Sequence, residues 1–117
     1  MLPLEKGKRA PNWALMQKDG QVRHLWDWRQ RSNVILIVAP QASSEQERIW
    51  QAGIESERKQ WLWLNAEVFV ITAPPPDLEA GVYAIDRYGC WIRTWPLEAW
   101  TFEDLQREYV YYEARHC

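Results

Sequence analysis

The stretch Asn33-Val34-Ile35-Leu36-Ile37-Val38-Ala39 decides how this chain of 117 residues folds. It is an unbroken apolar run rich in β-branched side chains, which is typical of a strand buried on both faces in the middle of a mostly parallel sheet. Pro40 ends the run, because proline has no N–H to give to a ladder and disfavours helix in the residue before it. The mixed charged and apolar residues that follow predict a helix from about Ser44 to Leu64.

The start of this helix has the pattern of a capping box. Ser44 and Glu47 are three residues apart, so the hydroxyl and the carboxylate can each accept a hydrogen bond from the other's backbone N–H. Reactive groups and anions often lie at such a junction in α/β proteins. Here the loop offers Ala42, Ser43 and Ser44, and helix capping explains the serines better than chemistry does. Gly53 is expected to weaken or bend the helix.

The rest of the chain supplies the other elements of an α/β domain. Residues 67–72 form a second buried strand, and parallel pairing with the first would close a right-handed βαβ unit. The prolines within residues 73–77 predict an extended surface connector. We also expect an edge hairpin within residues 10–24, a short helix over 25–31, a β-hairpin over 81–95 with Gly89 in the left-handed conformation, and a final capped helix from Thr101 to about Arg115.

The composition indicates one globular domain over residues 1–117. The chain is 47% hydrophobic and 26% charged, and its net charge of −2 gives no general attraction to nucleic acid or to an anionic membrane. It has no apolar run of membrane-spanning length, no secretory leader, and no His or Cys pair at metal-ligand spacing. We therefore expect a cytoplasmic protein without a metal, a cofactor, a nucleic-acid partner or a membrane partner.

Several motifs, taken in order, carry a family resemblance. They are Gly7-x-x-Ala10-Pro11-x-Trp13-x-Leu15, Asp19-Gly20-x-Val22-x-x-Leu25, the strand that runs into Pro40, the strand over residues 66–71, and the hairpin from Tyr83 through Asp86 to Gly89. Together they resemble the thioredoxin-like fold and, within it, the peroxiredoxins of the alkyl hydroperoxide reductase/thiol-specific antioxidant type. The resemblance implies a three-layer α/β/α domain with a central mixed sheet. Here the connector before the C-terminal hairpin is shortened.

The departures from the family concern its active site. The resemblance implies a peroxide-reducing cysteine where Glu47 stands, with Ser44 in the place of the preceding Thr or Ser. The two cysteines of a thioredoxin C-x-x-C motif would fall at about Ala42 and Glu45. The arginine or cis-proline that precedes the late strand in the relatives is replaced by residues 79–81, Glu-Ala-Gly. The degenerate active-loop positions are therefore Pro40, Ala42, Ser43, Ser44, Glu45 and Glu47.

The two cysteines leave a second hypothesis open. Cys90 lies beside a predicted turn and is interpreted as a packed residue, and Cys117 is the last residue, next to His116. In some peroxiredoxin relatives a cysteine near the C-terminus takes part in resolving disulfides. Cys117 is best interpreted as an incidental terminal thiol, but it could also react, pair with Cys90, or cross-link two chains.

The chain has nine tryptophans, more than a small core needs. Paired tryptophans two residues apart cannot both face one side of a helix, and an excess of aromatic side chains at a surface is typical of interaction sites. Trp91 and Trp95 are expected on the same face of the late hairpin. The alternative is that large rings simply cover a thin domain. The candidate interaction residues are Trp26, Trp28, Trp61, Trp63, Trp91 and Trp95.

These observations favour a non-catalytic redoxin-like domain that self-associates as a homodimer or binds a protein partner. The alternative is a thiol-dependent antioxidant oxidoreductase that reduces peroxides or disulfides with Cys117, either alone or together with Cys90. A third hypothesis, ligand binding at Ser43 and Ser44, has less support. Whether the chain is an enzyme is left open by the sequence.

Overall fold

The computed structural model describes residues 8–16 and 19–111. The expected order of elements is present, except that the region over 25–31 is a single 3₁₀ turn, which ends where Gln30 takes a positive φ of 61°. The described elements are β1 (Ala14–Met16), β2 (Val22–His24), the 3₁₀ helix η1 (Leu25–Trp28), β3 (Asn33–Val38), α1 (Ser44–Ser56), α2 (Arg58–Trp63), β4 (Ala66–Ile71), β5 (Gly81–Ile85), β6 (Trp91–Trp95) and α3 (Phe102–Tyr111).

The central sheet has four strands in the order β4-β3-β5-β6, and β1 and β2 form a separate hairpin. β3 pairs with β4 in parallel and with β5 antiparallel, so the sheet is mixed. The predicted βαβ unit and the late β-hairpin are both confirmed. Between β4 and β5 the connector makes only one turn, closed by the N–H of Leu78 and the carbonyl of Pro75 at 3.1 Å.

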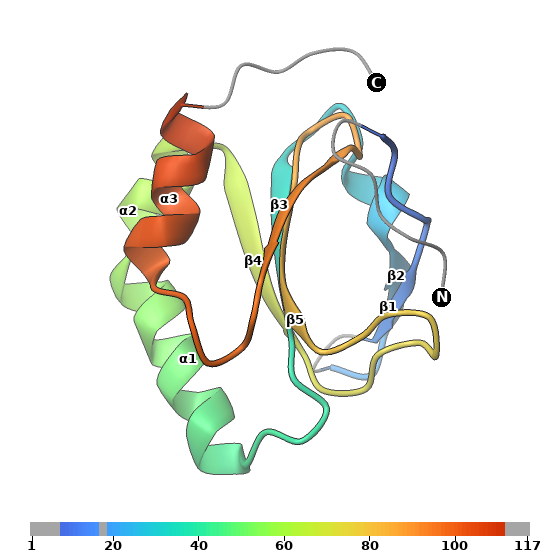
Figure 1. The fold of residues 1–117 in the computed structure, drawn as a ribbon, viewed down its shortest axis with the longest axis vertical. Helices are drawn as coiled ribbons and strands as arrows, with labels where there is room; N and C mark the ends of the chain where they lie inside the picture. The colour runs from blue at the N-terminus through green and yellow to red at the C-terminus, as the bar shows by residue number, and fades with distance from the viewer. Residues whose placement is uncertain (1–7, 17–18, 112–117) are drawn as a thin grey trace.

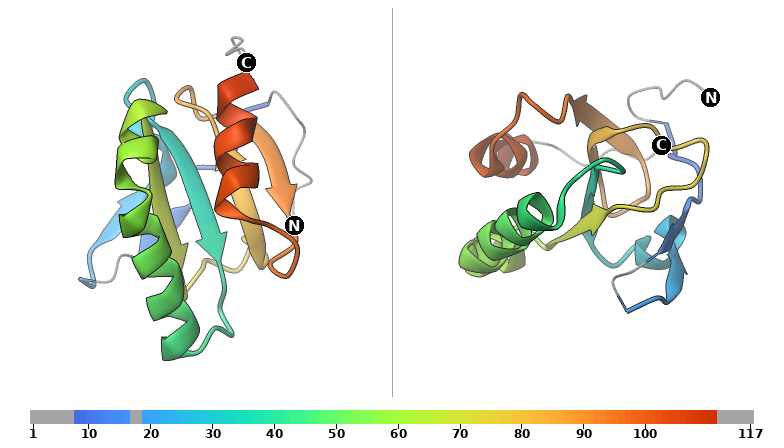
Figure 2. Two further views of the ribbon diagram at one scale, coloured as in Figure 1. Left: turned by 90° about the vertical axis from the view of Figure 1, so that its left-hand side faces the viewer. Right: turned by 90° about the horizontal axis from the view of Figure 1, so that it is seen from below.

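The sheet is covered on both faces by different kinds of structure. Helices α1, α2 and α3 lie on one face, and the β1–β2 hairpin with η1 lies on the other (Figure 1). Figure 2 shows α1 and α2 end to end on this face, roughly along the direction of the strands, with α3 on the same side of the sheet. No helix within residues 8–16 and 19–111 is long and apolar enough to cross a membrane.

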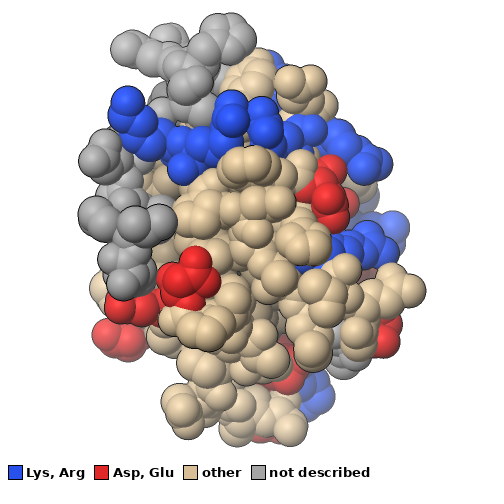
Figure 3. All heavy atoms as spheres, turned by 90° about the vertical axis from the view of Figure 1, so that its right-hand side faces the viewer, with Lys and Arg blue, Asp and Glu red and all other residues tan. Residues whose placement is uncertain are grey.

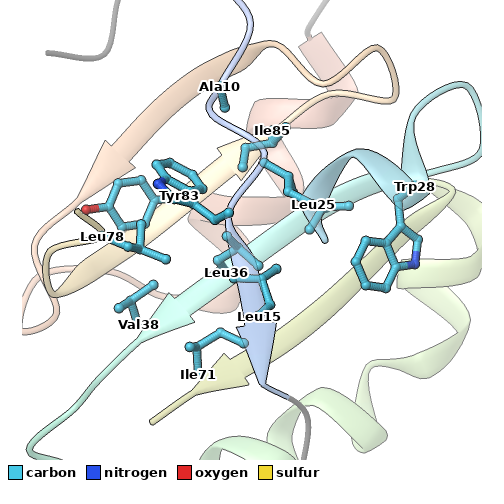
Figure 4. Close-up of a cluster of buried hydrophobic side chains, with 12 residues drawn as sticks. Ala10, Leu15, Leu25, Trp28, Leu36, Val38, Ile71, Leu78, Tyr83 and Ile85 are labelled. Carbon is cyan, nitrogen blue, oxygen red and sulfur yellow. The ribbon is translucent and has the colours of Figure 1, made fainter. Parts of the chain in front are cut away.

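Each face of the sheet has its own hydrophobic core. On the hairpin side, Leu15 and Leu25 pack onto Leu36, Val38 and other side chains of the sheet (Figure 4). On the helix side, the sheet residues pack with α2 and α3. The buried members there are Ile35, Ile37, Trp61, Ala66, Val82, Ala84, Ile92, Trp95, Leu105 and Tyr109. β3 supplies alternate side chains to both cores, as its apolar run predicts.

The long helix breaks four residues later than expected. Its two parts meet at Glu57, and Gly53 lies within α1. Gly53 allows close packing instead: a Cβ placed on it would lie 2.5 Å from Cε2 of Phe102. The Phe102 ring, at the start of α3, also packs edge-on against Trp61 with centroids 6.0 Å apart. The glycine therefore serves the contact between α1 and α3.

The β5–β6 hairpin contains a register shift that the sequence did not indicate. Ile85 pairs with Trp91 and Ala84 pairs with Arg93, so Ile92 is an extra residue in β6. As a result Trp91 packs with the hairpin-side core, whereas Trp95 packs with the helix-side core. The expectation that Trp91 and Trp95 share one face was therefore wrong, because a bulge reverses the alternation of the following side chains.

The start of α3 confirms the predicted cap. The Thr101 N–H donates to Oδ2 of Asp104 at 3.0 Å, and the Asp104 N–H donates to Oγ1 of Thr101 at 3.1 Å. This reciprocal pair fixes the direction in which the helix leaves β6. Residues 112–115, which were expected to extend the helix, lie outside the described residues.

Tyr109 of α3 reaches into the sheet with its hydroxyl group. The Ile85 N–H donates to this hydroxyl at 3.0 Å, and the hydroxyl lies within donating distance of the carbonyl oxygens of Val34 (3.0 Å) and Ile85 (2.9 Å). The side chain therefore satisfies buried backbone groups of two neighbouring strands. A buried backbone group left without a partner would be destabilising.

We predict that Tyr109→Phe lowers the free energy of unfolding by about 1–3 kcal/mol, because it leaves the buried Ile85 N–H without this acceptor. Urea denaturation followed by circular dichroism measures the change. Tyr88→Phe is the matched control, since the Tyr88 hydroxyl accepts an exposed hydrogen bond from Arg87 and its loss should change stability by less than about 0.5 kcal/mol. An equal effect of both substitutions would contradict the assigned role.

Candidate functional site

The loop between β3 and α1 occupies the place expected for an active site. Ala39 stays attached to the sheet, because its N–H donates to the carbonyl of Ile71 at 2.9 Å. The chain then turns at Pro40, and the N–H of Ala42 donates back to the carbonyl of Ala39 at 3.2 Å. Pro40 and Ser43 are exposed. The junction is therefore a short surface turn that leads directly into the helix.

The helix is capped by Ser43 and not by Ser44 as the sequence suggested. The backbone of Ser43 is extended (φ −72°, ψ 162°), and its side chain accepts a hydrogen bond from the N–H of Gln46 at 3.1 Å. The N–H of Glu47 donates to the Ser43 carbonyl at 3.0 Å, which begins the helical ladder. Ser44 is the first helical residue. Ser43 and Gln46 also match the capping-box spacing, so the signal was present one residue earlier.

The acidic residues near the loop stabilise the first turn of the helix. Glu45 forms an exposed salt bridge with Arg48 at 2.7 Å, a contact of i,i+3 type on the helix surface. Glu47 is half-buried in the first turn, where a carboxylate is favoured by the helix dipole. Neither position supplies a sulfur nucleophile. The arrangement can stabilise a helix start, and it lacks the thiolate that peroxide reduction requires.

The segment before β5 lies next to this loop, because Gly81 pairs with Val38 at the end of β3. The Tyr83 hydroxyl donates to the carbonyl of Glu79 at 2.8 Å, which ties the connector to the sheet. Burial, with a smaller contribution from the charge of Glu79, raises the pKa of Tyr83 above its usual value. Within the described residues there is no cis peptide bond, so the cis-proline of thioredoxins has no counterpart there.

The connector is also fixed from the N-terminal side. The Trp13 indole N–H donates to Oδ2 of Asp77 at 3.2 Å, and the Trp13 ring packs edge-on against Tyr83 with centroids 5.9 Å apart. Leu78 is buried in the hairpin-side core. These contacts hold the connector against the hairpin-side core.

The cysteines lie apart from the loop. Cys90 is fully buried beside the β5–β6 turn, at the end of the sheet opposite to Pro40, and it is disulfide-bonded. Cys117, the other cysteine of the chain, lies outside the described residues. Cys90 is therefore not an accessible thiol. Within the described residues, no group of three or more His, Cys, Asp or Glu side chains could hold a metal ion.

The six candidate tryptophans occupy different environments. Trp28, Trp61 and Trp95 are buried core residues, and Trp26 and Trp91 are half-buried against the hairpin-side core. Trp63 is 74% exposed, two residues after the buried Trp61. The expected division is present for Trp61 and Trp63, whereas Trp26 and Trp28 both contact the hairpin-side core. The structure brings only Trp63 fully to the surface, next to Leu62, which is 72% exposed and was not singled out from the sequence.

The fold is similar to known redoxin structures. A mitochondrial 2-Cys peroxiredoxin from Plasmodium falciparum matches with a TM-score of 0.67 and 14% identity over 91% of this chain and 92% of the other. A 2-Cys peroxiredoxin from Plasmodium vivax matches with 0.67 and 12% over 92% and 81%. A putative protein disulfide isomerase from Bacteroides thetaiotaomicron matches with 0.56 and 16% over 90% and 87%.

These similarities concern the fold. No protein-family model and no curated protein matches the sequence. The chain has a thioredoxin-like α/β fold like that of the peroxiredoxins, and its chemistry must be argued from its own residues.

We predict that Ser43→Ala lowers the free energy of unfolding by about 1 kcal/mol, because the Gln46 N–H loses its acceptor. Ser44→Ala is the control and should change stability by no more than about 0.5 kcal/mol, since Ser44 is an exposed helical residue. Thermal or urea denaturation of both variants measures the difference. A larger loss for Ser44→Ala would place the cap where the sequence pattern first suggested.

Proposed function

We propose that this chain is a redoxin-type domain without the family's peroxide-reducing chemistry, and that it works as a self-association module. The observation that carries the proposal is the outer edge of β4, which has no partner among the described residues, with the exposed Leu62 in the groove beside it and the exposed Trp63 next in the chain. The degenerate loop supports the non-catalytic part. There, Ser43 caps a helix and Glu47 stands where the resemblance implies the reactive cysteine.

β4 is an edge strand that has no partner on its outer side among the described residues. The carbonyls of Asn65 and Ile71 accept hydrogen bonds from the N–H groups of Asn33 and Ala39, on the β3 side. Because backbone groups alternate in direction along a strand, the N–H and C=O groups of Ala66, Val68 and Val70 point away from β3. The strand carries one charge, Glu67, and neither proline nor lysine. Proline and lysine on an edge strand hinder pairing with a further strand, so the outward N–H and C=O groups of β4 can form hydrogen bonds with another strand.

The surface beside this edge is mostly apolar. A groove of about 240 Å³ follows β4 on the helix side, lined by residues that include Trp61, Leu62 and Val68. Glu55, Arg58 and Glu67 also line this groove. Trp63, which is 74% exposed, follows Leu62 on the last turn of α2. Tryptophan is among the residues that contribute most to binding energy at interfaces. Apolar side chains next to an open strand edge therefore favour a protein contact.

A second copy of the chain fits this edge by symmetry. Two β4 strands related by a two-fold axis can pair antiparallel, and each copy then contributes the same patch. The outward N–H and C=O groups of one strand meet those of the other, which joins the two four-stranded sheets. Both sides of this interface are formed by residues of the same chain, so no other protein is required.

We predict that the native chain sediments as a monomer–dimer equilibrium at about 1–100 μM, the range in which modest interfaces dissociate. The double variant Leu62→Lys/Trp63→Lys should weaken the dimer by about tenfold or more, because it places charge in the contact. The matched control is Ile49→Lys/Val110→Lys, which changes two exposed apolar residues of the same helical layer. A native chain that stays monomeric throughout, or equal effects of the two double variants, would contradict the proposal.

We also predict that the native chain and Cys117→Ser consume hydrogen peroxide at the same background rate in the presence of a thiol reductant. The physical reason is that a low-pKa, accessible thiolate is required for turnover, and the loop supplies none. Coupled peroxide consumption measures the rate. Turnover by the native chain that is lost in Cys117→Ser would instead establish the thiol-dependent oxidoreductase, with Cys117 as its reactive group and Cys90 as a partner.

A further inference from the structure

A row of basic side chains crosses the end of the molecule where β3 begins and β5 ends. Figure 3 shows the row of Lys and Arg atoms across the upper part of the hairpin-side face. We define the basic belt as Lys8, Arg9, Arg29, Arg31 and Arg87. All of these are exposed except Arg29, which is half-buried. The chain as a whole has a net charge of −2, so the belt does not reflect a generally basic protein.

Backbone contacts around the β5–β6 turn bring the belt together from three parts of the chain. The backbones of Arg9 and Cys90 pair in an isolated antiparallel β-bridge, and the Trp91 N–H donates to the carbonyl of Lys8 at 2.9 Å. The Gln30 N–H donates to the carbonyl of Arg87, which joins the turn before β3 to the turn after β5. Residues far apart in the sequence are therefore held next to one another by the sheet.

Trp26 organises the centre of the belt. The guanidinium carbon of Arg9 lies 5.6 Å from the centre of the Trp26 ring, and that of Arg29 lies 5.2 Å from it. The Trp26 indole N–H donates to the carbonyl of Ala10 at 2.9 Å, so the ring itself is fixed. Both cations are therefore pre-positioned, which lowers the ordering cost of binding.

Within residues 8–16 and 19–111 the belt forms no salt bridge, unlike the arginines of the helical side. Arg48, Arg58, Arg93 and Arg107 each form a salt bridge. Among the described residues, none of the five belt residues does, and Nε of Arg29 is buried without a hydrogen-bond partner. Asp86, the acid closest in sequence to the turn, is buried and accepts the N–H groups of Tyr88 and Cys90 with Oδ1. Asp27 and Glu67 line the same pocket as Arg31 but form no salt bridge with it. Among the described residues, the belt therefore presents positive charge without ion-pair partners.

We propose that the basic belt binds an acidic peptide segment of a partner protein. Guanidinium groups pair with carboxylates through two parallel hydrogen bonds, and a row of them matches carboxylates spaced along an extended chain. A single-stranded nucleic acid fits less well, because its bases need free aromatic faces and the Trp26 ring is already engaged by guanidinium groups. This surface is separate from Leu62 and Trp63, so the inference does not rest on self-association.

The test is fluorescence anisotropy with a labelled polyglutamate peptide of about ten residues, at about 50 and 200 mM salt. We expect binding at the lower salt concentration and a loss of about tenfold or more in affinity at the higher one, because exposed charges are screened. No binding of the peptide at low salt would overturn the proposal.

Charge-matched variants locate the contact. Arg9→Gln/Arg31→Gln/Arg87→Gln should weaken peptide binding about tenfold or more, whereas Arg48→Gln/Arg58→Gln/Arg107→Gln removes the same charge from the helical side and should change it by less than about threefold. Circular dichroism checks that both triple variants are folded. Equal losses would show attraction by overall charge and would overturn the assignment. Tighter binding of a labelled oligothymidylate of similar length would assign the belt to nucleic acid instead.

Discussion

The burial of β3 on both faces is the constraint on which the rest of the structure depends. Its alternate side chains enter both hydrophobic cores, and it is hydrogen-bonded along its length to β4 on one side and β5 on the other. Every other layer is attached to it: the hairpin and η1 from one face, the helices from the other. The Tyr109 hydroxyl ties α3 to the same strand through the carbonyl of Val34. The position of the loop after Ala39 follows from where this strand ends.

Much of this architecture was predictable because its signals are local. The apolar run of β3, the left-handed Gly89 and the Thr101–Asp104 cap each depend on residues adjacent in sequence. Predictions that needed tertiary information were less accurate. Ser43 and Ser44 both fit a capping pattern, and the turn at Ala39–Ala42 selects Ser43. The packing of Phe102 on Gly53 and the bulge at Ile92 depend on partners that are distant in the chain.

The surfaces were the least predictable part of the candidate sites. Spacing shows that Trp61 and Trp63 cannot share a helical face, but only the sheet determines that Trp61 is the buried member. The loop could be assessed from sequence, because the absence of a cysteine between Pro40 and Glu47 is a property of residue type. The basic belt could not be found in this way, since its five residues come from separate segments and look too sparse along the chain. The turn of β5 and β6 brings them together.

The distribution of these features favours the proposed scaffold, whose binding surfaces lie away from the loop between β3 and α1. That loop lies at one end of β3, the basic belt lies at the other end, and the open edge of β4 lies along the side. The belt and the edge have no residue in common, so occupation of one leaves the other available. They also depend on different forces: exposed charge is screened by salt, whereas burial of Leu62 and Trp63 is driven by the hydrophobic effect and is little weakened by it. In the proposed arrangement, the β4 edge joins two copies of the chain while the belt binds an acidic segment, and neither contact uses a thiol in the loop.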